Sequence, residues 1–308
     1  MMETMKGRTI AQFTEQYGLG NPFDLDNERA YQAWRESKLE DYPQNIEQLI
    51  VEIGDPRRLS DAQYNAILER VVKTNMAIYA GNTGNDPDKK IPFELGERFG
   101  LHELDNNMGA DDGVTSLQVA HGQWRGGYIP YTNRPIHWHT DGYYNAPDQQ
   151  IRGLFLHCVS PAASGGENAL LDHEIAYIHL RDANPDYIRA LMAPDAMTIP
   201  ANVENGVEIR AARTGAVFTV ALDGNLHMRY TARSRSIEWR QDAITQSAVE
   251  ALKDFLASSS PYIYRATLQP GQGLVSNNVL HDRSGFEEDD AHKRLLYRLR
   301  YYQRIAGT

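Results

Sequence analysis

The sequence predicts a mainly β protein with flanking helices, a β-sandwich or barrel supported by helical segments. Residues 1 to about 90 contain amphipathic, helix-forming segments, whereas short β-favouring runs alternate with turn residues from about residue 114. One more amphipathic segment lies late in the chain. No repeat, low-complexity tract or linker interrupts this order, so we expect one domain over residues 1–308.

The helical part begins with the amphipathic stretch "NERAYQAWRESKLE". A longer helix is predicted for "LSDAQYNAILERVVKTNMAIYAG", with a start signal at Ser60 or Asp61 and its end at Gly81. The Gly, Asn, Asp and Pro content of "GNTGNDPDKK" predicts a loop, and "PFELGERFGLHEL" predicts another short helix.

The β-rich part begins with a strand, a turn and a strand in "IRGLFLHCV", "SPAASGG" and "ENALLD". A hairpin turning at Asp223-Gly224 is expected in "GAVFTVALDGNLHMRYT". A late helix follows at about residues 242–257. Strands are then predicted in "YIYRATL", "LVSNNVLH" and "RLLYRLRYY".

Composition excludes several classes of protein. The 308 residues carry 31 Lys and Arg against 41 Asp and Glu, a net charge of −10, which disfavours a nucleic-acid partner. A small anionic ligand held by a few buried arginines stays compatible with this charge. The single cysteine, Cys158, excludes a disulfide within the chain and is expected to be a buried hydrophobic residue. Without a signal-peptide core or an apolar run of about 18 residues, we expect no membrane span and a cytoplasmic protein.

A candidate metal site lies in "IHWHTDGYY", where His137, His139 and Asp141 fall within five residues. On a strand, the side-chain period of two would place all three on one face. His281, in "SNNVLHDRSGF", ends an apolar strand and is the best distant partner for His139 and Asp141. Two histidines and one carboxylate leave open positions on a metal, as in non-haem Fe(II) oxygenases. A solvated polar face and a structural His281 remain open as alternatives.

Other catalytic templates fit poorly. In "HEIAYIH" the histidines are six residues apart, whereas a zinc-protease helix needs them four apart. The chain has no GxSxG elbow and no Walker loop, and "GQGLVS" has too few glycines for a dinucleotide fingerprint. We therefore interpret "HEIAYIH" as the start of an ordinary helix.

The last predicted strand carries arginines at alternate positions. Arg294, Arg298 and Arg300 share one face of "RLLYRLRYY", and Leu295, Tyr297 and Leu299 share the other. A solvated face is the usual place for arginines on an edge strand, and we expect it for Arg300. The bidentate fork of Arg294 could instead bind the far carboxylate of a dicarboxylate co-substrate beside the metal.

Four stretches in order, "YTNRPIHWHTDGYY", "SPAASGGENALLD", "NNVLHDRSGF" and "KRLLYRLRYY", carry a resemblance that covers residues 131 to 302. Over this span the chain resembles the taurine dioxygenase/TfdA-like family of Fe(II)- and 2-oxoglutarate-dependent oxygenases, a wider group that includes the γ-butyrobetaine hydroxylases. The fold that this resemblance implies is the double-stranded β-helix, or jelly roll, over about residues 114–308.

The resemblance implies that His139, Asp141 and His281 hold Fe(II), with His137 outside the ligand set. It further implies that Arg294 binds the distal carboxylate of the co-substrate 2-oxoglutarate. Asn168 stands where the family has a threonine that donates to the same carboxylate, and its amide could make that hydrogen bond. Arg298 would serve the same site or face an anionic group of the substrate.

The activity implied is consumption of 2-oxoglutarate and O₂ with hydroxylation of a C–H bond in a small amino-acid-like or otherwise anionic metabolite. Desaturation and ring closure remain alternatives, as does a non-catalytic β-barrel that binds a metal or ligand. A zinc hydrolase would leave the paired arginines unexplained. The aromatic residues near the metal motif are core residues or a cage for a cationic amine, namely Tyr131, Trp138, Tyr143 and Tyr144. The presence of Asp141 disfavours halogenation, and the sequence leaves a homo-oligomer open.

Overall fold

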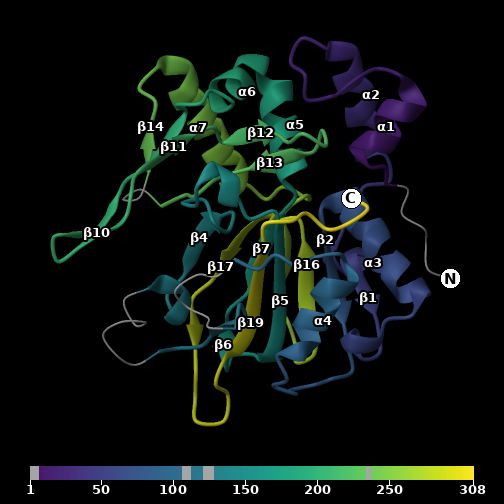
Figure 1. The fold of residues 1–308 in the computed structure, drawn as a ribbon, viewed down its shortest axis with the longest axis vertical. Coiled ribbons are helices and arrows are strands. Elements are labelled where there is room, and N and C mark those ends of the chain that lie inside the picture. Colours follow the sequence, from purple (N-terminus) through teal and green to yellow (C-terminus); the bar gives the residue numbers. More distant parts are fainter. Residues whose placement is uncertain (1–6, 106–111, 121–127, 234–236) are drawn as a thin grey trace.

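Two β-sheets occupy the middle of the molecule in the computed structural model, which describes residues 7–105, 112–120, 128–233 and 237–308 (Figure 1). The larger sheet has the strand order β1 (Ile50–Glu52), β2 (Met76–Ala80), β16 (Gln272–Ser276), β5 (Gly153–Ser160), β19 (Leu295–Tyr301), β3 (Thr115–Leu117). The smaller sheet has the order β15 (Tyr264–Ala266), β7 (Asn168–Leu171), β17 (Leu280–Arg283), β4 (Ile136–His139).

The chain passes repeatedly between these two sheets. In sequence order, β3, β5, β16 and β19 belong to the larger sheet, and β4, β7, β15 and β17 belong to the smaller one. All pairs among these strands are antiparallel, and only the added pair β1–β2 is parallel. Buried leucines from both sheets, among them Leu156, Leu170 and Leu274, form one hydrophobic cluster. The predicted mainly β class with helices is confirmed.

Helices cover the other face of the larger sheet. On β5, Leu154, Leu156 and Cys158 belong to the cluster between the sheets, whereas Phe155 and Val159 belong to a second cluster. That second cluster includes apolar side chains of α3 (Asp61–Thr74) and α4 (Lys90–Arg98). Because β5 is buried on both faces, its sequence is a nearly continuous apolar run.

The remaining helices lie beside and above the sheets in Figure 1. They are α1 (Ile10–Tyr17), α2 (Glu28–Leu39), α5 (His173–Ala183), α6 (Pro185–Leu191) and α7 (Ala243–Ala257), with short 3₁₀ turns at Ile46–Leu49, Pro56–Arg58, Ile129–Tyr131 and Pro147–Gln149. Two short strand pairs are β6 (Ser164–Gly165) with β18 (Phe286–Glu287) and β12 (Phe218–Val220) with β13 (Leu226–Met228). A three-stranded sheet has β8 (Met197–Ile199) between β11 (Arg213–Gly215) and β14 (Glu238–Trp239). No helix in the described part of the chain has the length and apolar character needed to cross a membrane.

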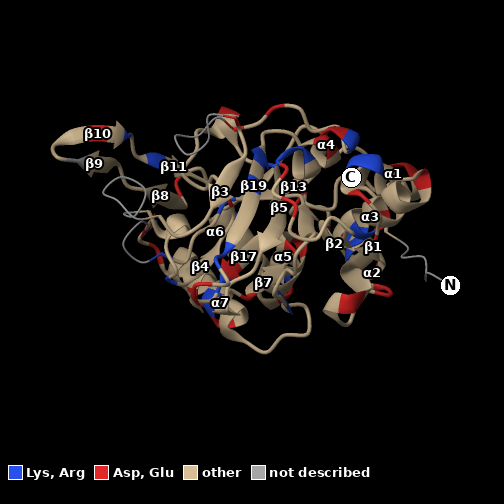
Figure 2. Cartoon of the chain, turned by 90° about the horizontal axis from the view of Figure 1, so that it is seen from below, with Lys and Arg blue, Asp and Glu red and all other residues tan. Residues whose placement is uncertain are grey.

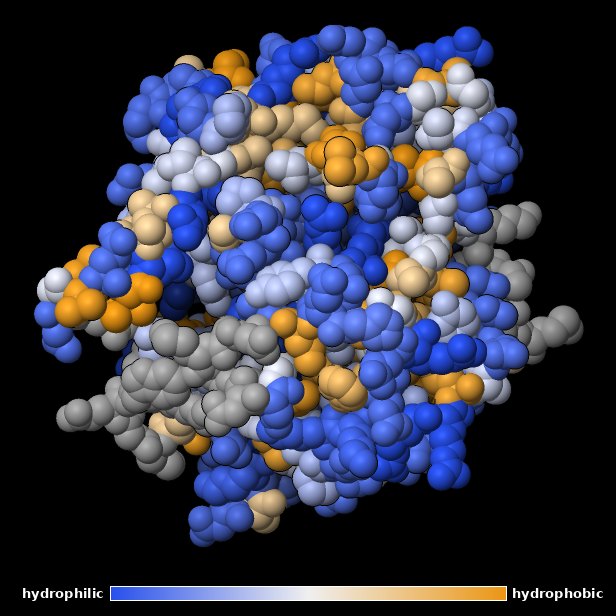
Figure 3. Space-filling view, in the orientation of Figure 1, coloured by the Kyte–Doolittle hydropathy of each residue, from blue (hydrophilic) through white to orange (hydrophobic). Residues whose placement is uncertain are grey.

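A hairpin of β9 (Asn202–Glu204) and β10 (Val207–Arg210) projects from the body of the molecule (Figure 1). Its apolar side chains are exposed, with Val203 at 56% and Val207 at 61% of full exposure, and they form the orange arm at the left of Figure 3. Polar side chains gather where this hairpin leaves the body (Figure 3).

The predicted helix boundaries are partly right. Ser60 is the N-cap of α3 and forms a capping box with Gln63, as its position predicted. The predicted end at Gly81 is wrong, because α3 stops at Thr74 and Asn75 takes the left-handed conformation with φ 58°. The next five residues form β2, fully buried between β1 and β16, so tertiary packing overrides a continuous helical pattern. The late helix expected at about residues 242–257 and the hairpin at Asp223-Gly224 are confirmed, and Asp242 is the N-cap of that helix.

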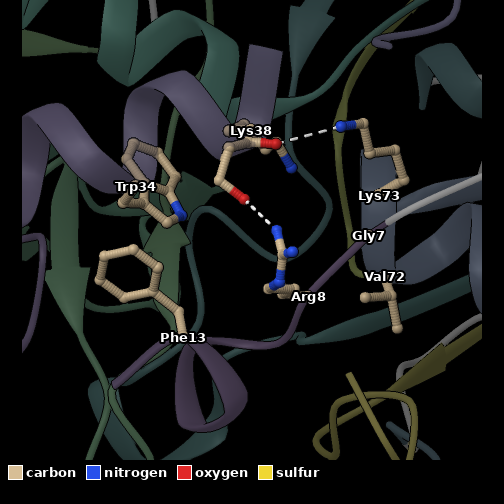
Figure 4. A pocket seen from close by; sticks show the side chains of 8 residues that line it. Gly7, Arg8, Phe13, Trp34, Lys38, Val72 and Lys73 are labelled. Carbon is tan, nitrogen blue, oxygen red and sulfur yellow. Dashed lines mark hydrogen bonds between the residues drawn. The ribbon is translucent and has the colours of Figure 1, made fainter. Parts of the chain in front are cut away.

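The N-terminal segment closes against α2 and α3 (Figure 4). Lys73 donates to the backbone carbonyls of Ser37, at 3.2 Å, and Glu40, and so caps the end of α2. Arg8 donates to the Ser37 hydroxyl at 2.8 Å. Burial, together with nearby Lys38, lowers the pKa of Lys73 to about 8. The cavity left between these residues is about 10 Å³, room for a water molecule at most.

Candidate metal centre

Two strands of the smaller sheet bring three candidate ligands together. His281 of β17 lies opposite His139 of β4 in the antiparallel register, and their ring centroids are 4.2 Å apart. Asp141 follows two residues after His139, and its Oδ1 is 3.6 Å from His139 Nε2. One ligand atom from each of the three residues lies within 4.8 Å of the others.

The local structure differs from the predicted one in two details. The strand ends at His139, so Asp141 lies in the following turn and not on the same strand face. The apolar strand before His281 ends at Ser276, and His281 lies near the start of the next strand, β17. His137 is exposed and lies outside the group of three, as expected.

Both histidine rings are held in the same way. Nδ1 of His139 is 2.9 Å from the carbonyl of His137, and Nδ1 of His281 is 2.9 Å from the carbonyl of Val279. A carbonyl can only accept, so each Nδ1 carries a proton, and Nε2 is the ring nitrogen left to bind a metal. This outer hydrogen bond is typical of histidines that bind metals.

Asn278 fixes the turn that carries Asp141. The Asp141 backbone N–H donates to Asn278 Oδ1 at 2.8 Å, and Asn278 Nδ2 donates back to the Asp141 carbonyl at 2.9 Å. The same amide group donates to the carbonyl of Ile151 at 2.7 Å. Asn278 has φ 54°, a left-handed conformation that asparagine tolerates better than most residues. These bonds hold the carboxylate beside the two rings.

The charges at this centre suit a divalent cation. Burial alone would raise the pKa of Asp141, but Arg298, with Nη1 3.4 Å away, and then His139 outweigh it and hold that pKa well below its usual value. Burial, with His139 nearby, lowers the pKa of His281 to about 4, so this ring is neutral at neutral pH. Asp141 Oδ2 is buried without a hydrogen-bond partner. Metal binding requires ionised carboxylates and neutral imidazoles, and Asp141 and His281 meet that requirement.

Arg294 is a buried cation that lies over the Phe286 ring, 5.0 Å from its centroid. It is 4% exposed, and burial lowers the pKa of its guanidinium to about 10. Within the described ranges, no carboxylate lies at ion-pair distance from it. A Cβ on Gly166 would lie 3.5 Å from Arg294 Nε, so the backbone of the Gly165-Gly166 turn passes beside the guanidinium. The arrangement leaves a buried positive group for an anion to pair with.

The family described as "Taurine catabolism dioxygenase TauD, TfdA family" matches residues 38–300 of the chain. The chain belongs to this family. The predicted family is therefore confirmed.

Two curated relatives of this TauD/TfdA member are described as uridine-5'-phosphate dioxygenases. The one from Amycolatopsis sp is 32% identical over 169 residues, which cover 53% of this chain and 60% of the relative. The one from Streptomyces sp is 33% identical over 178 residues, covering 54% of this chain and 62% of the relative. The matched part thus spans about three fifths of the length of these relatives.

Solved structures of similar fold include two amino-acid oxygenases. Asparagine oxygenase in complex with Fe(II), 2S,3S-3-hydroxyasparagine and succinate has a TM-score of 0.57 at 12% identity, over 95% of this chain and 88% of the other. The non-heme iron oxygenase OrfP with Fe, succinate and (3R,4R)-dihydroxy-L-Arg has a TM-score of 0.59 at 16% identity, over 80% of this chain and 82% of the other. At such low identity these likenesses concern the fold alone.

Asn168, expected in the place of the family's threonine, begins β7, the strand on which Leu170 lies opposite His281. Its Nδ2 donates to the carbonyl of Asp282 at 2.6 Å, and the next backbone N–H, of Ala169, donates to Asp282 Oδ1 at 2.8 Å. These bonds join β7 to β17. The amide of Asn168 has a second N–H, so donation to a bound carboxylate stays a prediction.

The expectation for Arg300 is wrong. Arg300 is 2% exposed and forms an ion pair with Asp105, and its Nη1 donates to the hydroxyl of Tyr144 at 2.9 Å. Tyr302 donates to the same Asp105 at 2.8 Å. β19 is an inner strand of the larger sheet, between β5 and β3, so its polar face is enclosed and needs a buried partner.

The four aromatic residues of the metal motif all belong to the main hydrophobic cluster or pack against it. Tyr131 and Tyr143 are each 8% exposed and belong to the main hydrophobic cluster. The Tyr143 ring contacts His139 edge-on at 6.5 Å and Tyr144 at 5.1 Å. Trp138 is partly buried against the same cluster.

Sequence reasoning missed the arginines next to these tyrosines. Arg233 Nη1 lies 3.4 Å from the hydroxyl of Tyr143, and the guanidinium of Arg210 lies 5.6 Å from the Tyr144 ring. Only their spatial position marks them, since neither stands in a motif. Cys158 is buried as expected, and burial raises its pKa to about 12, which excludes a reactive thiolate.

Proposed function

We propose that this protein uses Fe(II), 2-oxoglutarate and O₂ to oxidise a C–H bond of a small anionic metabolite, with hydroxylation as the simplest outcome. His139, Asp141 and His281 would hold the iron. The observation that carries the proposal is the group of three ligand atoms within 4.8 Å, in which Asp141 also has an oxygen, Oδ2, that is buried without a hydrogen-bond partner among the described residues.

We also propose that the fold is a double-stranded β-helix. Eight antiparallel strands are divided between the two sheets, and the chain passes repeatedly from one sheet to the other, with β1, β2 and the helices added around them. In such a fold the candidate ligands stand on the smaller sheet and the arginines of β19 on the larger one, so they would face the same interior.

2-Oxoglutarate would lie between the metal and Arg294. Bound iron would supply the oxidising power by joining reduction of O₂ and decarboxylation of 2-oxoglutarate to attack on the substrate C–H bond. The chain would supply position: Arg294 would pair with the distal carboxylate through its bidentate fork, and Asn168 would donate one amide hydrogen bond. Among the described residues, no carboxylate lies at ion-pair distance from the Arg294 guanidinium, which supports this role.

Arg298 would bind an anionic group of the substrate. Its Nη1 is 3.4 Å from Asp141, and its buried Nε has no hydrogen-bond partner within the described ranges. Once a metal takes the carboxylate of Asp141, the charge of Arg298 needs another anion. This supports the expectation of a small anionic molecule as the substrate.

The proposal is tested by loading the protein anaerobically with Fe(II) and adding 2-oxoglutarate. We expect one iron per chain, a weak visible charge-transfer band, and succinate after O₂ is admitted. His137→Ala is the matched control, because it changes a neighbouring exposed histidine, and it should behave as the wild type. Iron binding without any succinate, across a panel of small acids, would favour the non-catalytic binding protein.

A further inference from the structure

Three more arginines near the candidate metal centre have no acidic partner. Arg210, Arg213 and Arg233 are partly buried, and within the described part of the chain no carboxylate lies at ion-pair distance from any of them. The whole chain has a net charge of −10, so unpaired cations in one place run against its average. Figure 2 shows the basic segment at β11 that holds Arg213.

Arg233 is tied to the ligand strand. Thr231 forms an isolated β-bridge with His139, and the Ala232 N–H donates to the carbonyl of Trp138 at 2.8 Å. The next residue, Arg233, points its Nη1 at the hydroxyl of Tyr143, 3.4 Å away. Since the Tyr143 ring also touches His139, this guanidinium lies one side chain away from the metal ligands.

Arg210 reaches the same pair of tyrosines from the base of the projecting hairpin. Its Nη2 donates to the carbonyl of Pro200 at 2.8 Å and its Nη1 to that of Ala211 at 3.2 Å, which fixes the guanidinium 5.6 Å from the Tyr144 ring. Burial lowers the pKa of Arg210, the two tyrosines oppose this, and Arg213 adds to the lowering. Arg213 begins β11 three residues after Arg210, and its Nε is buried without a hydrogen-bond partner among the described residues.

The charges of the proposed site call for a multiply charged anion. Fe(II), Asp141, 2-oxoglutarate and Arg294 together would be neutral, and Arg300 is paired with Asp105. The positive charges of Arg298 and of Arg210, Arg213 and Arg233 are then left without an anion. A zwitterionic amino acid would cancel none of their charge, and its ammonium group would find no free carboxylate here among the described residues. A phosphate monoester is close to a dianion and accepts several bidentate guanidinium contacts.

We propose that Arg210, Arg213 and Arg233, with the Tyr143 hydroxyl, form a subsite for the phosphate group of a phosphate-monoester substrate. This inference rests on the proposed function and names the substrate class of the same site. The arginines come from two separate segments, so they can enclose a tetrahedral group from different sides. The surface is polar where the hairpin leaves the body (Figure 3), and the curated relatives are described as uridine-5'-phosphate dioxygenases.

The test compares phosphorylated molecules with their unphosphorylated counterparts. Binding of uridine 5'-phosphate and uridine, glucose 6-phosphate and glucose, and phosphoserine and serine is measured by calorimetry on the full chain, with and without anaerobic Fe(II) and 2-oxoglutarate. We expect at least one phosphate ester to bind about tenfold or more tightly than its partner. The pair that responds distinguishes a nucleotide, a sugar phosphate and a phosphorylated amino acid.

Variants assign the effect to the subsite. Arg233→Ala and Arg210→Ala should each weaken the phosphate ester about tenfold and leave its unphosphorylated partner unchanged. Arg189→Ala, which removes the same charge from an exposed position on α6, should change neither. Circular dichroism melting confirms that each variant is folded, and Arg233→Lys should recover part of the affinity.

Two outcomes would overturn the inference: no ester binding better than its partner, or subsite variants binding the ester as Arg189→Ala does. Tight binding of free asparagine or arginine that ignores Arg233 would overturn it as well. The iron and 2-oxoglutarate band, read on the same samples, reports on the proposed function independently. Its presence with no phosphate preference leaves that function standing and removes only the phosphate subsite.

Discussion

Two buried ionic clusters in this molecule differ in how completely their groups are paired. In the first, Lys38 of α2 contacts Asp172 at 2.8 Å and Glu174 at 2.5 Å. Asp172 also accepts from Tyr42 at 3.1 Å and from Asn75 at 2.9 Å. In the second, Asp141 has Arg298 at 3.4 Å and His139 at 3.6 Å, while Oδ2 has no hydrogen-bond partner.

The difference separates a structural cluster from a site that needs ligands. Burying charge costs less when each charge has a partner, and the cluster at Lys38 meets that condition within the chain. It joins α2 to the N-cap of α5, where Asp172 accepts the Glu174 N–H at 2.9 Å. At the candidate metal centre, Asp141 Oδ2 and Arg298 Nε are buried without a hydrogen-bond partner among the described residues. Unpaired buried groups of this kind point to a ligand supplied from outside the chain.

The largest effect is expected at the metal ligands. His139→Ala removes one of three ligands, so the variant should lose bound iron and, with it, the 2-oxoglutarate band. Metal analysis and visible spectra of the anaerobic protein measure both. Full iron retention in a folded His139→Ala would contradict the ligand assignment, and His137→Ala serves as the matched control.

A substitution in the Lys38 cluster should change the stability of the protein and leave iron binding unchanged. Lys38→Ala leaves two buried carboxylates without their cation, and loss of one partner of a buried pair costs about 3–5 kcal/mol. Urea unfolding of the wild type and the variant measures this difference. Iron per folded chain should stay unchanged, so a folded Lys38→Ala that has lost its iron would break the distinction between the two clusters.

Arg294→Ala should weaken 2-oxoglutarate binding without loss of iron. Truncating one partner of a desolvated charge pair costs about 2–5 kcal/mol, or roughly thirty- to several-thousand-fold in affinity. Arg294→Lys should recover only part, because an ammonium cannot reproduce the bidentate fork. Anaerobic titration with 2-oxoglutarate, followed by the visible band, gives the affinities.

Arg298→Ala provides the contrast to Arg294→Ala. It should leave 2-oxoglutarate turnover without substrate nearly intact and impair oxidation of the substrate. A larger loss of 2-oxoglutarate affinity in Arg298→Ala than in Arg294→Ala would exchange the roles of the two arginines.

The smallest effect is expected at Asn168. If its second amide N–H donates to the distal carboxylate, Asn168→Ala should weaken 2-oxoglutarate by about 0.5–1.5 kcal/mol, and by at most about 3 kcal/mol for a charged acceptor. The same titration measures it. An unchanged affinity would mean that Asn168 serves only to join β7 to β17 through Asp282.

Local rules predicted much of the fold and the main residues of the site. The cap at Ser60 follows from side-chain hydrogen bonds within one turn, and a helix start at Ser60 or Asp61 was predicted. The strand period placed Arg298 and Arg300 on one face of β19, where Arg300 is buried and Arg298 is half-buried, opposite the buried Tyr297 and Leu299. The sequence also predicted a candidate set of two histidines and one carboxylate, because His139 and Asp141 are only two residues apart.

The tertiary structure alone decided which charges are paired. Asp105 lies 195 residues before Arg300, and Asn278 lies 137 residues after Asp141, so no local pattern marks either partner. Nor does a local pattern mark Arg233, which lies 90 residues after Tyr143 in the sequence and contacts its hydroxyl. Helix caps and strand faces are set by neighbours in sequence, whereas the partner of a buried charge is whichever group the packed sheets bring within a few ångströms. Sequence therefore determined the elements and the candidate ligands, and packing determined which of the buried charges are left for a ligand to bind.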